Sequence, residues 1–337
     1  MTHKITVSPS QTLFQAEENE TVLASAIRQG YNLPHSCQSG VCGCCAARIV
    51  SGTVHQSGEY DDYVLTEEEV AAGTVLLCCC QARSDLVVDM PSYAGTKALD
   101  VRTLPARIGK IDIRGDVAVF TAALPKAPPF RFYAGQYMEI LLKDGSRSYS
   151  VASAPSQNGT LEFHVRLHEG GLFSPKLFDG SLKSGDIIRL RGPLGTFYLN
   201  EESQKPLLLL ATGTGLAPVK SILARLADTG SERQVYFYYG CRTRTDLYDS
   251  EAVADLVARL PNARYTPSLS RAENDPEWLG ARGYITAHAQ ADLPDLSGFE
   301  AYACGSPAMV ADAKTTLCGQ NKLPECAFHA DAFTAHV

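Results

Sequence analysis

The chain has 337 residues, of which 45% are hydrophobic and 20% charged, and its formal net charge at pH 7 is -7. This length is enough for three domains that each bury a core. The acidic balance disfavours nucleic acid as a partner, because phosphate binding needs a basic surface, and no apolar stretch reaches the roughly 18 residues of a membrane-spanning helix.

The first part of the chain mixes strand and helix patterns. Thr66 stands in an N-cap position with Glu69 three residues later, and this capping box predicts a short helix over 66–73. The other predicted elements are strands at 4–7 and 11–16, a pair of strands over 47–56 and an amphipathic helix at 20–30. Such strands around one helix are typical of a β-grasp domain, which we expect over residues 1–93. Residues 94–103 lose this pattern and are predicted to be a linker.

Four cysteines in this part of the chain have the spacing of an iron-sulfur site. Three stand in the run HSCQSGVCGCC with gaps of four and two residues, and the fourth follows the apolar run TVLL. This is the ligand spacing of a plant-type ferredoxin, in which four thiolates hold one [2Fe-2S] cluster. Gly40 and Gly43 give the loop the backbone freedom to curl around the cluster. The predicted metal ligands are Cys37, Cys42, Cys45 and Cys78.

The choice of the last ligand is open, because Cys78, Cys79 and Cys80 are consecutive. Plant-type ferredoxins carry this ligand six residues before the Ser of a similar Ser-Asp pair, and that offset favours Cys78. Choosing Cys44 in place of Cys45 would leave a gap of one residue instead of two. Disulfides and structural zinc are disfavoured, since the polar start MTHKITVSPS predicts no secretory signal and one distant thiol is an unusual zinc pattern.

Residues 104–203 are predicted to form a small antiparallel barrel, because strand patterns separated by turn signals follow one another closely. These strands are expected at 106–113, 116–124, 135–142, 146–153, 161–167 and 186–192.

Two motifs in this region are typical of a flavin site. The R-x-Y-S run at 147–150 offers an arginine to clamp a phosphate, an aromatic ring to lie against the isoalloxazine, and a hydroxyl to bond a ring nitrogen. Further on, EGGLFSPKL places two glycines before a predicted helix start, where backbone amides can cradle a pyrophosphate. The residues predicted to bind FAD are Arg147, Ser148, Tyr149, Ser150, Gly170, Gly171 and Ser174.

From residue 204 to 337 strands alternate with helices, which is typical of a doubly wound α/β domain. A G-x-G-x-x-P turn lies between the strand at 206–212 and a predicted helix, as a nucleotide-binding turn must. A second buried strand ends in Cys-Gly, and ligands of such sheets bind at the carboxyl ends of strands. The predicted nicotinamide-nucleotide site comprises Thr212, Gly213, Thr214, Gly215, Pro218, Arg242, Cys304 and Gly305.

The motif order, four cysteines, then RSYS with GGLFS, then GTGLAP and CGSP, resembles NAD(P)H-dependent flavin and iron-sulfur reductases of the ferredoxin-NADP reductase superfamily. Over nearly the whole chain the sequence looks most like reductase components of bacterial aromatic-ring oxygenases and reductases of CDP-6-deoxyhexose (glucoseen) biosynthesis. The resemblance implies a plant-type ferredoxin domain, an FAD-binding barrel and a nicotinamide-nucleotide domain. It also implies catalytic positions at Ser150 and Cys304, with Phe333 in the tail FHADAF covering the flavin.

For function, the resemblance implies hydride transfer from the nicotinamide to flavin N5, then passage of single electrons to the cluster and on to a partner. The expected partner is a terminal oxygenase that hydroxylates aromatic compounds, as a dioxygenase or a monooxygenase. A sugar dehydratase is the alternative partner, and a redox sensor or electron carrier is a third reading, disfavoured by the built-in hydride source. We expect a cytoplasmic monomer that binds neither nucleic acid nor membrane.

The nucleotide donor remains open between NADH and NADPH. The strand at 233–240 is followed by Cys-Arg-Thr-Arg, with no acidic residue at its tip to receive a ribose hydroxyl and with two arginines able to meet a 2′-phosphate. Related reductases that use NADH also carry an arginine here, so NADH is the expected donor. His35, His164 and His168 lack metal-ligand spacing and are interpreted as structural or surface residues.

Overall fold

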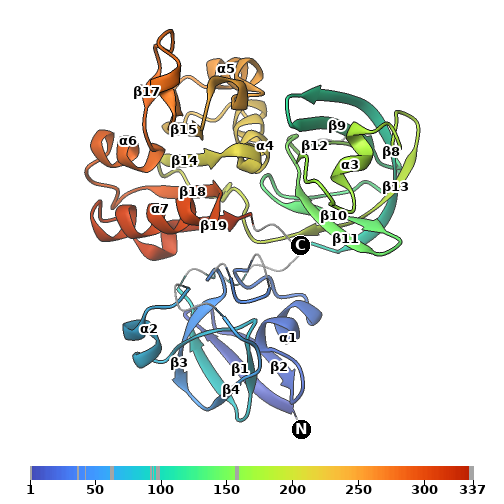
Figure 1. The fold of residues 1–337 in the computed structure, drawn as a ribbon. Coiled ribbons are helices and arrows are strands. Elements are labelled where there is room, and N and C mark those ends of the chain that lie inside the picture. The colour runs from blue at the N-terminus through green and yellow to red at the C-terminus, as the bar shows by residue number, and fades with distance from the viewer. Residues whose placement is uncertain are drawn as a thin grey trace. The chain divides into compact units, whose positions relative to one another are not determined.

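The computed structural model describes residues 2–35, 38–41, 43–60, 64–91, 93, 95, 99–155 and 159–333. The chain divides into two compact units (Figure 1). Unit 1 consists of Met1–Asp100 with Gly195–Phe197, and unit 2 of Val101–Leu194 with Tyr198–Val337. Among the helices within the described ranges, none combines the length and the apolar character needed to cross a membrane.

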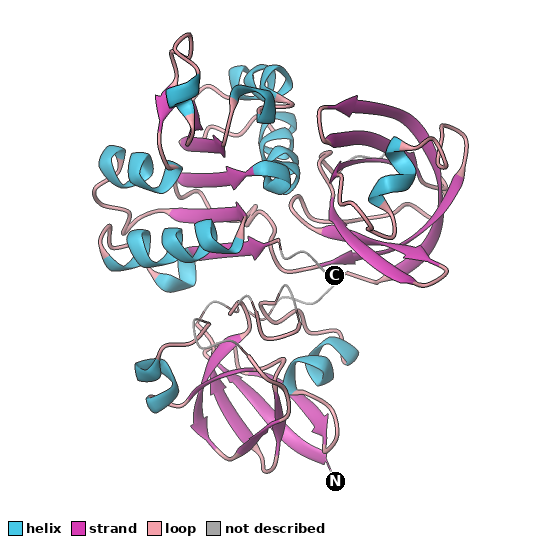
Figure 2. Ribbon diagram, viewed as in Figure 1, coloured by secondary structure: helices cyan, strands magenta, loops and turns pink. Residues whose placement is uncertain are grey.

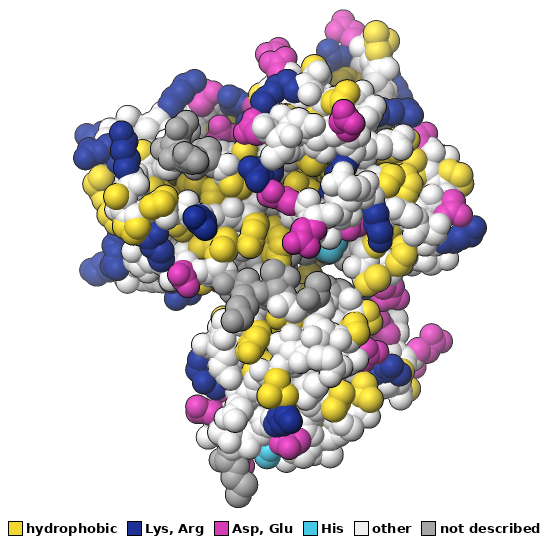
Figure 3. Space-filling view, turned by 180° about the vertical axis from the view of Figure 1, so that it is seen from behind, with side chains coloured by type: hydrophobic (Ala, Val, Ile, Leu, Met, Phe, Trp, Pro, Cys, Tyr) yellow, Lys and Arg dark blue, Asp and Glu magenta, His cyan; other side chains and the backbone are white. Residues whose placement is uncertain are grey.

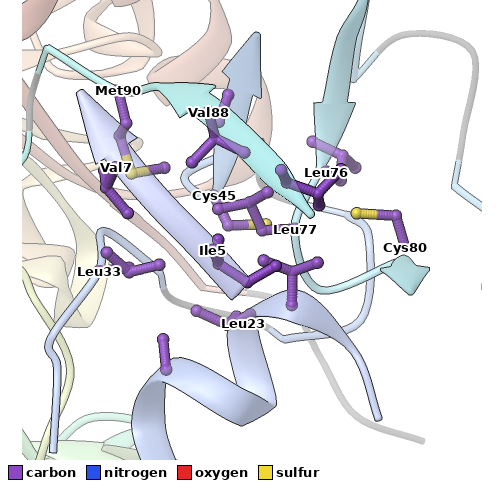
Figure 4. Packing of buried hydrophobic residues seen from close by; sticks show 14 of the residues in the cluster. Ile5, Val7, Leu23, Leu33, Cys45, Leu76, Leu77, Cys80, Val88 and Met90 are labelled. Carbon is purple, nitrogen blue, oxygen red and sulfur yellow. The ribbon is translucent and has the colours of Figure 1, made fainter. Parts of the chain in front are cut away.

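Unit 1 is built on a mixed five-stranded sheet with the order β2-β1-β7-β3-β5, beside a two-stranded sheet of β4 and β6. Strand β1 runs antiparallel to β2 and parallel to β7, so both of its edges are paired. Its inward residues Ile5 and Val7 join Leu23 of the first helix in one buried core (Figure 4). The elements are β1 (Thr2–Ser8), β2 (Thr12–Glu17), α1 (Val22–Arg28), β3 (Ala46–Ser51), β4 (Val54–Gln56), α2 (Glu67–Ala71), β5 (Thr74–Leu76), β6 (Cys80–Ala82) and β7 (Leu86–Asp89).

Two pairs of hydrogen bonds stabilise unit 1, one at the start of helix α2 and one between His35 and Thr196. The Thr66 hydroxyl accepts from the Glu69 N–H at 3.2 Å, and the Glu69 carboxylate accepts from the Thr66 N–H at 2.8 Å, so the predicted capping box is confirmed. The Thr196 hydroxyl accepts from the His35 N–H and donates to the His35 carbonyl, both at 2.8 Å. This pair of bonds explains why residues 195–197 cluster with unit 1.

The first part of unit 2 is a six-stranded antiparallel sheet with the order β11-β10-β13-β8-β9-β12. A bridge between Val151 and Phe163 joins its two edges and closes it into a barrel around a core that includes Phe120. Strand β8 begins at Arg102, inside the predicted linker, because its pairing with β13 continues to that residue. The elements are β8 (Arg102–Arg114), β9 (Val117–Ala123), β10 (Tyr137–Leu142), β11 (Gly145–Ser150), β12 (Thr160–Arg166), α3 (Ser174–Phe178) and β13 (Ile187–Leu194).

The second part of unit 2 is a six-stranded parallel sheet with the order β17-β16-β15-β14-β18-β19. From β14 to one edge of the sheet the strands follow in chain order as β15, β16 and β17, and β19 follows β18 at the other edge. The strand order therefore reverses between the neighbours β14 and β18. Right-handed crossovers then put the helices on opposite faces of the sheet, α4 with α5 and α6 with α7 (Figure 2). This is the predicted doubly wound domain.

The elements of this sheet domain are β14 (Leu207–Thr212), the 3₁₀ turn η1 (Gly213–Gly215), α4 (Leu216–Asp228), β15 (Val235–Cys241), η2 (Arg244–Asp246), α5 (Ser250–Ala258), β16 (Ala263–Leu269), η3 (Ala272–Asn274), β17 (Ala281–Arg282), α6 (Ile285–Asp292), β18 (Glu300–Gly305), α7 (Pro307–Gly319), η4 (Glu325–Ala327) and β19 (Phe328–Ala332). On the face seen in Figure 3, acidic and basic side chains are interspersed, in keeping with a net charge of -7.

Candidate functional site

Two of the four predicted cluster ligands lie together in unit 1. The Cys45 side chain is 2% exposed and lies within hydrogen-bonding reach of the half-buried Cys78 thiol. The backbone N–H of Gly40, from the predicted cluster loop, also reaches Cys78, while Cys45 and burial together raise the pKa of the Cys78 thiol. The other two predicted ligands, Cys37 and Cys42, lie outside the described residues.

The neighbouring cysteines have different surroundings. The Cys79 sulfur lies 3.6 Å from that of Cys78 and donates to the Glu59 carbonyl at 3.7 Å. Cys80 begins β6, is 2% exposed and packs beside Leu76 and Leu77 in the core, where burial raises its pKa to about 12 (Figure 4). This arrangement favours Cys78 over Cys80 as the predicted fourth ligand.

The loop before β3 requires glycine at a position that the sequence had singled out. Gly40 has φ +82°, and a Cβ placed on it would lie 2.7 Å from the Glu59 carbonyl oxygen and 2.9 Å from the Cys79 sulfur. Gly43 also has a positive φ, +71°. The backbone therefore curls tightly against the segment that carries Cys78 and Cys79, as a loop wrapping a cluster must, so the described residues fit the predicted [2Fe-2S] group.

The two predicted flavin motifs meet in the barrel. Strand β11 places Arg147 and Tyr149 on one face and exposed Ser148 and buried Ser150 on the other. The Tyr149 ring lies 5.4 Å from the ring of Phe173, which belongs to the GGLFS segment, and burial raises the Tyr149 pKa to about 12. The two motifs are thus in contact through these two rings in the core of the barrel.

The GGLFS segment is a closed loop before α3. The Ser174 hydroxyl accepts from the His168 N–H at 3.0 Å, so a hydrogen bond joins the two ends of the loop. Gly170 has φ +75°, and a Cβ on Gly171 would lie 3.0 Å from the His168 carbonyl oxygen. Both glycines thus suit a backbone that must approach a phosphate closely.

The two predicted nucleotide motifs are in direct contact at the point where the strand order reverses. Gly215 ends η1 after β14, and a Cβ on it would lie 2.3 Å from the Cys304 carbonyl oxygen at the end of β18. A Cβ on Gly305, whose φ is +141°, would lie 2.1 Å from the Thr212 hydroxyl oxygen. That same hydroxyl accepts from the Ser306 N–H at 3.1 Å. The contact leaves space only for glycine and builds a cradle at the carboxyl edge of the sheet, where ligands of doubly wound folds bind.

The other predicted residues of this site surround the cradle. Pro218 is buried in the first turn of α4, and Cys304 is fully buried, with a pKa raised well above its ordinary value by burial. The Phe333 N–H donates to the Gly305 carbonyl at 2.8 Å, which brings the tail beside the second nucleotide motif. Arg242 is exposed beyond the end of β15.

Sequence reasoning missed two acidic residues near this edge. Buried Asp331 of β19 pairs in register with Cys304, and only its place as a lone acid in an apolar tail could have marked it. Asp246 of η2 accepts from the N–H and hydroxyl of Thr243 at 2.8 and 2.9 Å. Asp246 thus adds a carboxylate close to the end of β15, because the chain turns back after Thr243.

Comparisons with known proteins identify the three kinds of domain that the motifs predict. Family models match a 2Fe-2S iron-sulfur cluster binding domain at residues 5–83, an oxidoreductase FAD-binding domain at 108–198 and an oxidoreductase NAD-binding domain at 209–315. The chain is 36% identical over 334 residues to a CDP-6-deoxy-L-threo-D-glycero-4-hexulose-3-dehydrase reductase of Yersinia pestis, covering 99% of each. It is 34% identical to the reductase component of a phenol 2-monooxygenase of Pseudomonas sp. strain CF600, covering 94% of this chain and 90% of that one.

Solved structures show the same arrangement of folds. An Amycolatopsis cytochrome P450 reductase superposes with a TM-score of 0.75 at 31% identity, and the ferredoxin reductase of a carbazole 1,9a-dioxygenase with 0.68 at 25% identity. Each match covers 99% of both chains. The similarity therefore extends over all three predicted domains.

Proposed function

This chain belongs to the family of reductases that join a 2Fe-2S iron-sulfur cluster binding domain, an FAD-binding domain and an NAD-binding domain, and we propose that it supplies a partner oxygenase with electrons from NADH. It is an oxidoreductase whose cofactors are FAD, a [2Fe-2S] cluster and a nicotinamide nucleotide. When bound, the nicotinamide would supply a hydride, the flavin would take up its two electrons, and the cluster would pass these on one at a time. The observation that carries the proposal is the glycine-only contact of Gly215 with Cys304 and Gly305.

The chain's own residues supply binding and orientation. We propose that Arg147, Tyr149 and the 168–174 loop hold FAD, with Ser148 and Ser150 beside them. Thr212 and the turn at 213–215 would seat the nucleotide, with Pro218 in the helix start and Arg242 at the edge. Cys304 keeps its proton because burial raises its pKa, so it would meet the nicotinamide as a small neutral side chain. Phe333 would cover the flavin.

Two partner classes follow from the relatives. The phenol 2-monooxygenase reductase component and the P450 reductase support a terminal oxygenase, and hence a place in the breakdown of aromatic compounds. The 36% identity to the hexulose-dehydrase reductase supports a sugar dehydrase as the second candidate. Reconstitution with one purified protein of each class would separate them, because only the true acceptor should turn over at the expense of the nucleotide.

NADH is proposed as the donor because one of the two arginines after β15 is already engaged. The Arg244 guanidinium forms two hydrogen bonds to the Asp275 carboxylate, at 2.8 and 2.9 Å, and lies 5.9 Å from the centre of the Trp278 ring. A guanidinium held in this way is poorly placed to receive a 2′-phosphate. Arg242 alone then offers less attraction for that group.

The experiment that tests the proposed function is an anaerobic visible spectrum of the purified holoprotein during separate titrations with NADH and NADPH. We expect NADH to bleach both the flavin and the iron-sulfur bands, and NADPH to do so only at higher concentration. An unchanged spectrum with both nucleotides would overturn the reductase assignment, whereas a stronger response to NADPH would overturn only the choice of donor.

We further propose that the partner docks at the rim of the cluster loop, where Val41 is half-buried. Val41→Glu should slow electron delivery to the partner about tenfold, because a new charge disturbs a matched surface. Direct reduction of ferricyanide by NADH should stay nearly intact. The control is Val50→Glu, the same change at a 57% exposed position of β3. If the Val41 variant loses both rates equally, or if the Val50 variant is equally slow, this docking face is wrong.

A cytoplasmic location and a monomeric state complete the proposal. A cluster held by thiolates requires free cysteines, which a reducing compartment maintains. Size-exclusion chromatography with light scattering would test the monomer.

A further inference from the structure

A network of ionisable side chains lies in unit 2 outside the flavin and nucleotide motifs. Strand β12 contributes Glu162 and His164, helix α4 contributes Lys220, and the segment before α5 contributes Tyr248 and Asp249. One ligand-type atom from each of Glu162, His164 and Asp249 lies within 4.8 Å of the others. The network therefore joins a strand of the barrel to two segments of the nucleotide domain.

The cation of this acidic group is a lysine of the chain itself. The Lys220 ammonium donates to Glu162 at 2.8 Å and to Asp249 at 2.6 Å, and its side chain is only 13% exposed. Burial alone would lower the pKa of Lys220, but the two carboxylates outweigh it and the pKa is raised. The Lys220 ammonium thus supplies the positive charge that a metal ion would otherwise supply to the Glu162 and Asp249 carboxylates.

The protonation of His164 follows from its two neighbours. Its Nε2 lies 2.9 Å from Glu162, and its Nδ1 lies 2.8 Å from the Tyr248 hydroxyl. Although burial opposes ionisation of Glu162, the bond from His164 and the charge of Lys220 lower its pKa to about 2. Because the ionised Glu162 carboxylate can only accept a hydrogen bond, Nε2 of His164 carries the proton that it donates. Burial lowers the pKa of His164, so Nδ1 is unprotonated and accepts from the Tyr248 hydroxyl.

A second cation comes from the barrel. Arg114, at the end of β8, forms an ion pair with Asp249 and donates two hydrogen bonds to Asp112 at 3.0 Å. Asp249 of the nucleotide domain is therefore bound by Arg114 of the barrel and by Lys220 of its own domain, and Lys220 also binds Glu162 of the barrel. Each of the two less exposed carboxylates, Glu162 and Asp249, is thus paired with a cation, and Asp112 adds a third, partly exposed carboxylate beside Arg114. Removing one partner of such a pair leaves a charge without compensation, which is strongly destabilising.

The network sits close to both cofactor motifs on rigid elements. Strand β12 (Thr160–Arg166) carries Glu162 and ends two residues before the 168–174 loop, while α4 carries Lys220 five residues after Gly215. One further bond joins α4 to the barrel, because the Ser221 hydroxyl donates to the carbonyl of Ser153, in the segment that follows β11, at 2.7 Å. The Arg166 guanidinium also lies 3.6 Å from the position of a Cβ on Gly213.

We propose that Lys220 is a positioning residue for hydride transfer: by binding Glu162 and Asp249 at once, it holds the nucleotide-binding turn in register with the flavin-binding loop. This inference rests on the proposed function, because it assumes that the two motifs seat the reacting groups. Displacement of either reactant by about 1 Å can cost as much as 100-fold in rate. Loss of Lys220 leaves two facing carboxylates whose repulsion would part the elements.

The test is stopped-flow measurement of flavin reduction by NADH in the holoprotein under anaerobic conditions. Lys220→Met, which keeps the length of the side chain without its charge, should lower the limiting rate at saturating NADH at least about tenfold. FAD content and the dissociation constant for NAD⁺ should change less than about twofold. The matched control is Arg259→Met. It breaks the exposed ion pair between Arg259, just after α5, and Asp228, the last residue of α4, and it should leave the rate unchanged.

The double variant Lys220→Met/Glu162→Gln separates charge balance from packing. It leaves Asp249 paired with Arg114, and the amide oxygen of the introduced glutamine still accepts from His164, so we expect a faster limiting rate than in Lys220→Met alone. A rate in Lys220→Met within twofold of the unaltered protein would overturn the inference, and so would a double variant that is equally slow or slower. If Lys220→Met alone does not fold, a double variant that folds and is reduced supports the inference, and one that also fails to fold overturns it. Failure of the proposed function itself would appear earlier, as an unaltered protein that NADH does not bleach.

Discussion

Cys78→Ser is expected to abolish the iron-sulfur cluster, whereas Cys80→Ser should retain it. Cys78 lies beside Cys45 and receives the Gly40 N–H, so it faces the loop that carries the other predicted ligands. Serine offers a hydroxyl in place of a thiolate. Loss of a residue that only hydrogen-bonds to a metal ligand can weaken metal binding about 100-fold, so loss of one of the four ligands themselves should weaken iron binding at least as much. Analysis of iron and acid-labile sulfide per chain measures the effect.

Cys80→Ser is the matched control, since the same replacement is made two residues away. Cys80 is 2% exposed in the core, so a hydroxyl there should cost about 1–3 kcal/mol of folding free energy and lower the melting temperature, without loss of iron. Direct flavin reduction by NADH should persist in both variants, because the flavin and nucleotide domains lie in unit 2. A full complement of iron in Cys78→Ser would show that Cys79 or Cys80 is the ligand.

Gly215→Ala should strongly slow the reduction of the flavin by NADH. The added Cβ would lie 2.3 Å from the carbonyl oxygen and 2.6 Å from the carbonyl carbon of Cys304, and 2.8 Å from the Cα of Gly305. All three are backbone atoms of a buried strand, so the glycine turn itself must move away. Overpacking of this kind costs about 1–3 kcal/mol, and a displaced turn should slow flavin reduction at least about 100-fold.

Gly319→Ala controls for the change of residue. Gly319 is the last residue of α7, and a Cβ there meets nothing within 4 Å. Alanine should therefore leave flavin reduction unchanged and raise the free energy of unfolding by up to about 1 kcal/mol. Stopped-flow reduction and thermal unfolding of both variants provide the comparison. Normal reduction of the Gly215 variant by NADH would remove the glycine turn from the proposed nucleotide site.

The sequence by itself was sufficient for the class of cluster, the three-domain architecture and the family. These depend on patterns that are local in the chain: cysteine gaps of four and two, the capping box of Thr66 and Glu69, and strands that alternate with helices after residue 204. Local patterns are readable because a tight loop, a helix cap or a strand is stabilised mainly by residues a few positions apart.

Only the tertiary structure decided which distant residues meet. It placed Cys78 rather than Cys80 beside Cys45, pressed Gly215 against Cys304, and set Lys220 between Glu162 and Asp249. Lys220 looks like an ordinary helix residue in the sequence, because its partners lie 58 and 29 positions away. Such contacts follow from strand register and helix packing, and a shift of one residue in register would turn every side chain of a strand to the other face.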